Sequence, residues 1–260
     1  MESHRVSAGA VQLYVATAGH SADPPLLLLH GWPESHRGWR PVCPLLENEF
    51  FLIMPDQRGF GRSDLPTGTD AYRMRRLVAD AAAVLDHFDI GRAGIVGHDF
   101  GGIVAWALGA LASQRVSRMT VMCAPHPMRF REAALTDRRQ LAIGFYAWLM
   151  NVGDAGERLL ASRGFQDLSD WAFGSSPGVD EDLRAAYRKE WSRPGVFHAM
   201  AEWYRANYPP DLVNPDVSFR LPSVKVPVRY VHGEKDAAFV PAMATGSGSW
   251  VDAEYDEQMI

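Results

Sequence analysis

One nine-residue stretch constrains the fold of this chain more than any other feature. Residues 94–102 read Gly-Ile-Val-Gly-His-Asp-Phe-Gly-Gly, and an apolar pattern with helical spacing follows directly. The stretch therefore predicts a strand, a sharp turn and a helix. Glycines two positions before and after Asp99 remove the Cβ atoms that would clash in so tight a turn. The turn is expected to present the Asp99 carboxylate at its tip.

The position of Asp99 allows two interpretations. A carboxylate held at the start of a helix can attack an electrophilic carbon and form an ester, and the free N–H groups of the helix stabilise its charge. Aspartate is also a favoured N-cap residue, so the same side chain could serve only to begin the helix. The stretch alone leaves both interpretations open.

Apolar runs elsewhere in the chain alternate with helical patterns. Residues 26–29 and 51–54 are continuously apolar, as strands buried on both faces are, and residues 11–15 alternate as a half-buried edge strand does. A helical pattern at 77–88 and a strand pattern at 116–122 follow. This alternation predicts an α/β fold with a mostly parallel central sheet and helices on both faces.

The sequence pattern changes after residue 127. Three aromatic-rich helical segments follow, with no convincing strand among them: residues 141–150, 183–191 and 196–208. A strand pattern then resumes at 226–231. We therefore expect residues 128–222 to form a helical cap over an α/β core made of residues 1–127 and 223–260.

Composition narrows the range of partners. The chain has 260 residues and a formal net charge of −5 with scattered Lys and Arg, so neither nucleic acid nor a membrane surface is an expected partner. The longest aliphatic run, residues 26–29, is too short to span a bilayer. Cys43 and Cys123 have no metal-ligand spacing, so no disulfide framework, metal site or cofactor is expected. These features favour a cytoplasmic protein that acts on a small molecule.

Four motifs follow predicted strands, at the sheet edge where ligands bind in parallel sheets. They are His-Gly-Trp-Pro-Glu-Ser at 30–35, Asp-Gln-Arg-Gly-Phe-Gly-Arg-Ser-Asp at 56–64, Gly-His-Asp-Phe-Gly-Gly at 97–102 and Gly-Glu-Lys-Asp at 233–236. In this order, over nearly the whole chain, they resemble the α/β-hydrolase fold epoxide hydrolases of the soluble bacterial type. The resemblance implies a hydrolase that opens an epoxide through an alkyl ester on Asp99.

The resemblance also implies roles for individual residues. Asp99 would be the nucleophile, and the backbone N–H groups of Trp32 and Phe100 would form the oxyanion hole. Asp236 matches the acid that orients the base, and Tyr204 matches a tyrosine that protonates the opened epoxide, unless it is only a core aromatic. The substrate pocket would include His30, Pro33, His98, Tyr146, Trp148 and Leu149. Its occupant would be a small apolar or aromatic epoxide.

Two positions depart from the family pattern. Leu149 stands where a second tyrosine usually lies, with Tyr146 about one helical turn away. Ser249 stands where the family has its catalytic histidine, only 13 residues after Asp236, whereas a helical crossover and a strand together need about 15 or more. A C-terminal strand-helix unit is therefore expected to be shortened. Because serine is no base near neutral pH, the ester could form but its hydrolysis should stall.

These departures leave alternatives open. A dehalogenase uses the same aspartate ester. Fluoroacetate dehalogenases have an arginine in place of Phe100, and haloalkane dehalogenases usually have an asparagine in place of Trp32, so both positions favour the epoxide interpretation. A binding or pathway protein of the same fold would not react at all. For the C-terminus we expect that the sheet ends at residues 226–231 and that 246–250 form an irregular loop. The uncovered strand would then either leave the chain marginally stable or pair with a second copy as a homodimer.

Overall fold

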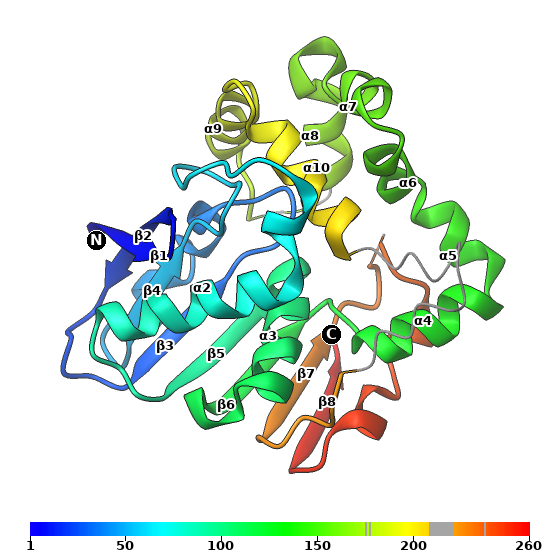
Figure 1. The fold of residues 1–260 in the computed structure, drawn as a ribbon. Coiled ribbons are helices and arrows are strands. Elements are labelled where there is room, and N and C mark those ends of the chain that lie inside the picture. The colour runs from blue at the N-terminus through cyan, green and yellow to red at the C-terminus, as the bar shows by residue number, and fades with distance from the viewer. Residues whose placement is uncertain (175, 177, 208–220, 237) are drawn as a thin grey trace.

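A computed structural model of the protein describes residues 1–174, 176, 178–207, 221–236 and 238–260 (Figure 1). In these residues eight strands form one sheet in the order β1-β2-β4-β3-β5-β6-β7-β8. The strands are Glu2–Ala8, Val11–Ala18, Pro25–Leu29, Phe51–Pro55, Ala93–His98, Val116–Met122, Val228–His232 and Tyr255–Met259, numbered in that sequence. Strand β2 pairs antiparallel with β1 and β4, and every other pair is parallel. The predicted α/β class with a mostly parallel sheet is confirmed.

The N-terminal edge of the sheet differs from the expectation. Residues 11–15 belong to β2, which is not an edge strand because β1 pairs along its whole length. In β1 only Val6 and Ala8 are buried, and its other side chains are exposed or half-buried. The sequence pattern did not predict β1 because two buried apolar side chains are too few to show the alternation expected of a strand.

The central strand β3 is buried on both faces, as its continuous apolar sequence predicts. Leu27 and Leu29 belong to the large core that also contains residues of α2 (Met74–His87) and α3 (Phe100–Leu111). Leu28 points the other way and packs in a second cluster with Trp39 and with Cys43 of α1 (Cys43–Leu46). This alternation follows from the two-residue period of a strand. Figure 1 shows α2 and α3 together on one face of the sheet.

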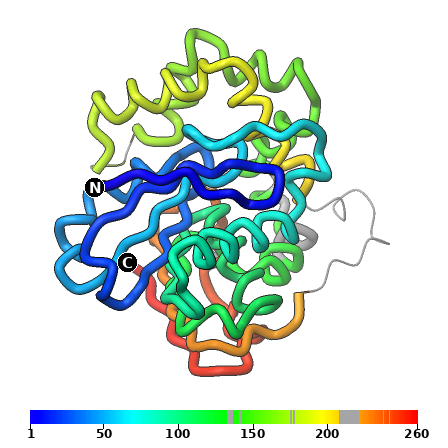
Figure 2. Tube along the Cα trace, turned by 60° about the vertical axis from the view of Figure 1, so that its left-hand side comes forward, coloured from blue at the N-terminus to red at the C-terminus, as the bar shows by residue number. Residues whose placement is uncertain are grey.

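The segment between β6 and β7 is helical, and its described residues contain no strand. Its helices are α4 (Pro127–Thr136), α5 (Arg138–Ile143), α6 (Phe145–Asn151), α7 (Asp154–Leu160), α8 (Gln166–Phe173), α9 (Glu181–Trp191) and α10 (Val196–Asn207). Helices α6 to α10 lie beyond the carboxyl ends of the strands (Figures 1 and 2). The indole N–H groups of Trp191 and Trp203 donate to the carbonyls of Pro33 and Arg58, at 2.8 and 2.9 Å. Two buried tryptophans thus join these helices to the sheet domain.

The C-terminal end of the sheet contradicts the prediction that the sheet stops at β7. Strand β8 pairs parallel with β7 from Val228↔Tyr255 to His232↔Met259. The crossover between them is the shortened part, because its described residues contain only two 3₁₀ turns, Pro241–Met243 and Ser247–Trp250. Residues 246–250 are therefore ordered as a turn and are not an irregular loop. The sequence pattern missed β8 because none of its side chains is fully buried.

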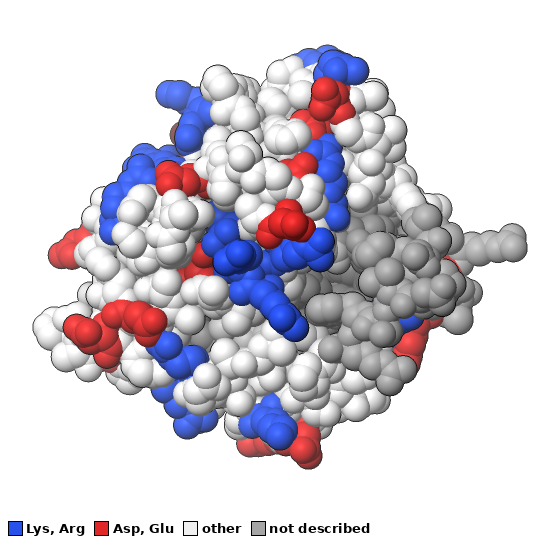
Figure 3. Space-filling model, in the orientation of Figure 1, with Lys and Arg blue, Asp and Glu red and all other residues white. Residues whose placement is uncertain are grey.

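The order of the strands and the charges on the surface are relevant to whether the chain pairs with a second copy or with another partner. Since β8 covers β7, the reason for expecting a homodimer no longer holds. On the face shown in Figure 3, acidic and basic side chains both occur, with several basic ones near the middle. Among the helices that the structure describes, none has the length and apolar character needed to cross a membrane.

Candidate active site

The turn between β5 and α3 holds Asp99 in an unusual backbone conformation. Its φ of 51° and ψ of −123° lie outside the regions that most residues adopt. A Cβ atom on Gly97 would lie 2.4 Å from the carbonyl oxygen of Gly101, and one on Gly101 would lie 2.1 Å from that of Leu29. Only glycine fits at these two positions. The predicted strained turn is confirmed, and such strain costs on the order of 1–3 kcal/mol.

Two backbone N–H groups hold the Asp99 carboxylate. The Trp32 N–H donates to Oδ1 at 2.7 Å, and the Phe100 N–H also donates to the carboxylate. Asp99 occupies the N-cap position of α3 but its side chain makes no capping hydrogen bond, so a capping role alone does not explain it. Burial raises the pKa of Asp99 to about 6, against the opposing effects of the His98 charge and the two N–H donors. The carboxylate is therefore largely ionised at neutral pH.

The loop that carries Trp32 is fixed from several sides. The Trp32-Pro33 peptide bond is cis. His30, expected in the substrate pocket, is fully buried: its Nδ1 pairs with the Gly31 carbonyl at 2.9 Å, and its Nε2 accepts the Gln57 N–H at 3.1 Å. Burial lowers the pKa of His30, which keeps the ring neutral. His30 thus supports the loop as a scaffold residue.

A half-buried ion pair that the sequence did not reveal lies beside the turn. The Nδ1 atom of His98 lies 3.1 Å from Oε2 of Glu34, which also accepts the Gly31 N–H at 3.2 Å. Burial alone would lower the pKa of His98, but the Glu34 charge and a hydrogen bond with Cys123 raise it well above its usual value. Burial likewise opposes ionisation of Glu34, yet His98 lowers its pKa overall. A cationic His98 therefore sits next to the Asp99 carboxylate.

Two tyrosines from the inserted helices approach the same place. The Tyr204 ring on α10 lies 4.9 Å from the Phe100 ring and 5.4 Å from the Trp32 ring. Tyr146 on α6 stacks on Trp32 at 5.9 Å and contacts Tyr204 at 5.9 Å. Both rings thus pack on the two residues whose N–H groups hold Asp99. Tyr146, one turn from the family's expected tyrosine position, is brought to the site by this packing, whereas Leu149 is half-buried on the same helix.

The C-terminal side of the site is built differently. Asp236 follows β7, and its Oδ1 accepts the N–H groups of Ala238 and Phe239 at 2.7 and 3.1 Å. Its Oδ2 lies 3.6 Å from Nε2 of His232. Ser249 is exposed on the Ser247–Trp250 turn. In the part of the chain that the structure describes, no histidine hydrogen-bonds to both Asp99 and Asp236.

The side chain of this turn that faces inward is Ser247. It is fully buried, and its hydroxyl accepts the His126 N–H at 3.0 Å. The His126 ring stacks on Trp250 at 5.2 Å between centroids. The turn therefore packs against the residue before α4 through Ser247 and Trp250. Ser249, which lies between these two contacts, is exposed to solvent. The sequence alone does not show that Ser247 is the buried serine of this turn and Ser249 the exposed one.

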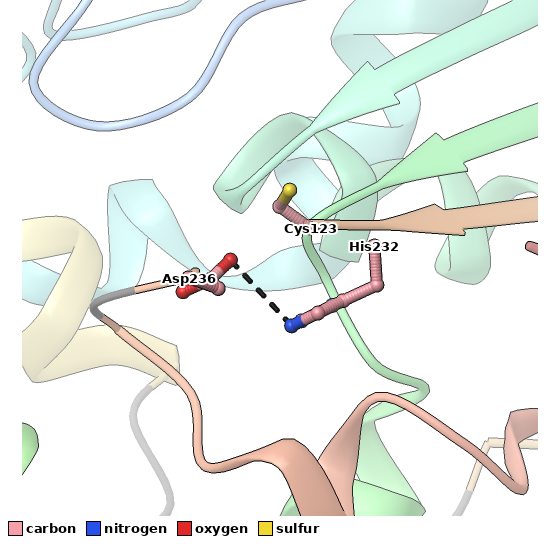
Figure 4. Close-up of side chains that lie close together, drawn as sticks. All are labelled: Cys123, His232 and Asp236. Atoms are coloured by element: carbon pink, nitrogen blue, oxygen red, sulfur yellow. Dashed lines mark ion pairs between the residues drawn. The ribbon is translucent and has the colours of Figure 1, made fainter. Parts of the chain in front are cut away.

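Two groups of possible metal-ligating side chains occur among the described residues. Cys123, His232 and Asp236 form one group at the ends of β6 and β7 (Figure 4). Asp154, Glu157 and His198 form the other, on the inserted helices. No sequence motif predicts the first group, because Cys123 is more than 100 residues from His232 and Asp236.

The chain is similar to known proteins over most of its length. A family model described as the alpha/beta hydrolase fold matches residues 24–259. AB hydrolase superfamily protein YfhM of Bacillus subtilis (strain 168) is 34% identical over 206 residues, 77% of this chain and 71% of that protein. Epoxide hydrolase 4 of Mus musculus is 27% identical over 248 residues, 92% of this chain and 67% of that protein.

Solved structures of the same fold also include epoxide hydrolases. One titled as novel epoxide hydrolases belonging to the alpha/beta hydrolases superfamily, from metagenomes of hot environments, superposes with a TM-score of 0.85 and 29% identity. The superposition covers 99% of this chain and 91% of that one. The chain therefore belongs to the α/β-hydrolase fold family, and its named relatives there include epoxide hydrolases.

Proposed function

We propose that the protein opens an epoxide by attack of the Asp99 carboxylate on a ring carbon. A carbon–oxygen ester bond forms, the ring carbon–oxygen bond breaks, and the epoxide oxygen takes up a proton. The observation that carries this proposal is the Asp99 carboxylate itself, displayed on a strained turn and held by the N–H groups of Trp32 and Phe100. A group fixed in this way needs little reorganisation to attack.

Tyr146 and Tyr204 are the proposed donors to the epoxide oxygen. Their rings contact each other, and both pack on Trp32. A hydroxyl hydrogen bond polarises the carbon–oxygen bond that breaks, and proton transfer then neutralises the alkoxide. The aromatic surroundings suit a small apolar or aromatic epoxide.

Release of the product is the proposed weak step. Hydrolysis of the ester requires a base that activates water, and the Trp32 and Phe100 N–H groups would then stabilise the charge on the ester oxygen. His98 is engaged with Glu34, and Ser249 is exposed. We therefore expect the ester to accumulate, with slow diol formation.

The test is intact-protein mass spectrometry after incubation with an aryl epoxide. A solved epoxide hydrolase mutant from Bacillus megaterium is titled as a complex with (R)-3-[1]naphthyloxy-propane-1,2-diol, so 1-naphthyl glycidyl ether is a reasonable probe. We expect one adduct per chain with the full mass of the epoxide. Asp99→Ala should give none, and Asp252→Ala, which removes an exposed carboxylate, should behave like the native chain.

Other outcomes point to the alternatives. An adduct formed only from a haloalkane, with loss of halide, would assign the site to dehalogenation. Binding of the epoxide by calorimetry without adduct or diol would assign the chain to a non-catalytic member of the family. Rapid diol formation without an accumulated adduct would show that another residue supplies the base.

A further inference from the structure

We propose that Cys123, His232 and Asp236 bind one divalent transition-metal ion of the zinc type. The three side chains come from the end of β6, the end of β7 and the turn that follows, and they lie close together, with His232 and Asp236 directed toward each other (Figure 4). The site adjoins the candidate active site, because Asp236 is the acid implied by the family resemblance and Cys123 hydrogen-bonds to His98 beside Asp99. Metal binding there does not depend on the proposed reaction at Asp99.

The distances suit a shared ion better than direct contact. One donor atom from each residue, a sulfur, a nitrogen and an oxygen, lies within 4.8 Å of the others. His232 Nε2 and Asp236 Oδ2 are 3.6 Å apart, which is too long for a hydrogen bond. Two such ligands on a tetrahedral zinc ion lie about 3.3–3.4 Å apart, given bonds of about 2.0–2.1 Å. His232 and Asp236 would therefore need to move by only a few tenths of an ångström, and the Cys123 sulfur by up to about 1 Å, to complete the coordination.

His232 carries an unsatisfied nitrogen at this point. Its side chain is 1% exposed, and Nδ1 is hydrogen-bonded to the Tyr230 hydroxyl at 2.7 Å. The opposite nitrogen, Nε2, is buried and makes no hydrogen bond in the described structure. Buried polar atoms rarely remain unpaired, because desolvation without a partner is costly. Metal-binding histidines have this arrangement, with one nitrogen fixed by a neighbour and the other on the ion.

The other two ligands are also held in place. Oδ1 of Asp236 accepts two backbone N–H groups, which leaves Oδ2 directed at His232. Cys123 has a φ of 49°, which is uncommon for a residue with a side chain, and its N–H donates to the Val231 carbonyl at 2.9 Å. Sulfur and imidazole ligands favour zinc over magnesium or calcium, and three protein ligands leave a fourth position for water.

The second group of possible ligands serves as an internal control. Asp154, Glu157 and His198 offer only oxygen and nitrogen, and Asp154 and His198 are exposed. Glu157 is already paired with Arg205 at 2.5 Å. This group lacks sulfur, so a probe that reports thiolate coordination separates the two sites.

The experiment is a titration of the reduced full chain with Co²⁺, followed by the near-ultraviolet charge-transfer absorbance of a cobalt–thiolate bond. We expect saturation at one equivalent and displacement by Zn²⁺. Cys123→Ser should abolish the band. His232→Ala and Asp236→Asn should weaken Zn²⁺ affinity at least tenfold, measured against a chromophoric chelator.

Matched variants complete the design. Cys43→Ser removes the other cysteine, which is buried beside Trp39 and Met54, and His198→Ala removes the exposed group, so both should keep the band. Circular dichroism verifies that each variant is folded. As a measurement without substitution, Zn²⁺ should slow alkylation of Cys123 but not of Cys43. The proposal is overturned if the folded native chain shows no band, or if the band survives Cys123→Ser.

Discussion

The two sides of the candidate site are held by different means. On the nucleophile side, Asp99 is fixed by N–H groups from two separate elements and by glycines that contact backbone atoms. On the C-terminal side, Asp236 is held by the N–H groups of the next few residues, and Ser249 faces solvent. The Asp99 side depends on the core of the sheet, and few substitutions there would leave the protein folded. The C-terminal side depends on a short crossover, so the proposed attack by Asp99 can persist in a chain whose proposed release step is weak.

The largest expected effect is a loss of folding stability when the glycines around Asp99 are replaced. Gly101→Ala places a Cβ atom against the Leu29 carbonyl, so we expect a loss of about 3 kcal/mol in the free energy of unfolding. Gly91→Ala is the control, since nothing lies within 4 Å of its Cβ position, and should change that free energy by less than about 0.5 kcal/mol. Urea denaturation measures both. Equal stability of the two variants would show that the turn is not tightly constrained.

A smaller effect is expected at the inserted helices. Tyr204→Phe keeps the ring contacts with Phe100 and Trp32 but removes the hydroxyl, so ester formation should slow by about 10- to 100-fold. Tyr146→Phe should have an effect of similar size. Tyr14→Phe, on strand β2, should leave the rate unchanged. Quenched-flow mass spectrometry gives these rates, and unchanged rates in both site variants would remove the tyrosines from the mechanism.

The pH dependence follows from the Asp99 carboxylate. Burial raises its pKa from 3.8 to about 6, and only the ionised form attacks, so ester formation should fall as pH falls through 6. The rate at pH 5 should be about tenfold below the rate at pH 8. The folded state binds this proton more tightly than the unfolded state, so the contribution to stability is present below pH 3.8 and is lost as pH rises through 6. A pH profile that is flat between 5 and 8 would contradict the assignment.

The smallest effect is expected on the C-terminal side. Because Ser249 is exposed, a histidine there would point to solvent, and Ser249→His should change the rate of diol release by less than about twofold. Ser249→Ala is the matched control for loss of the hydroxyl. Steady-state measurement of diol formation compares the three proteins. Full rescue of turnover by the histidine would show that the turn can bring residue 249 to the ester.

The sequence predicted those parts of the fold and site that depend on local pattern. The strained Asp99 turn follows from glycines at fixed spacing, and β3 follows from a continuous apolar run. Strands β1 and β8 were missed because edge strands with few buried side chains have no such pattern. Their positions are set by pairing with a neighbouring strand, which local sequence does not encode.

The contacts around the candidate site also depend on tertiary packing that a local sequence pattern does not encode. Glu34 and His98 are 64 residues apart, and Cys123 meets His232 only because β6 and β7 are neighbours in the sheet. The approach of Tyr146 depends on how α6 and α10 pack over Trp32. In each case the sequence supplies the residue type, and tertiary packing supplies the partner.

The most direct test of the central claim is to locate the covalent adduct. The native chain is incubated with 1-naphthyl glycidyl ether, quenched in acid, digested and mapped by tandem mass spectrometry. The account predicts a modification of one equivalent, confined to Asp99 and absent from Asp99→Ala. An adduct on another residue such as Cys123 or Glu34, or a native chain that forms diol with no ester on Asp99, would contradict it.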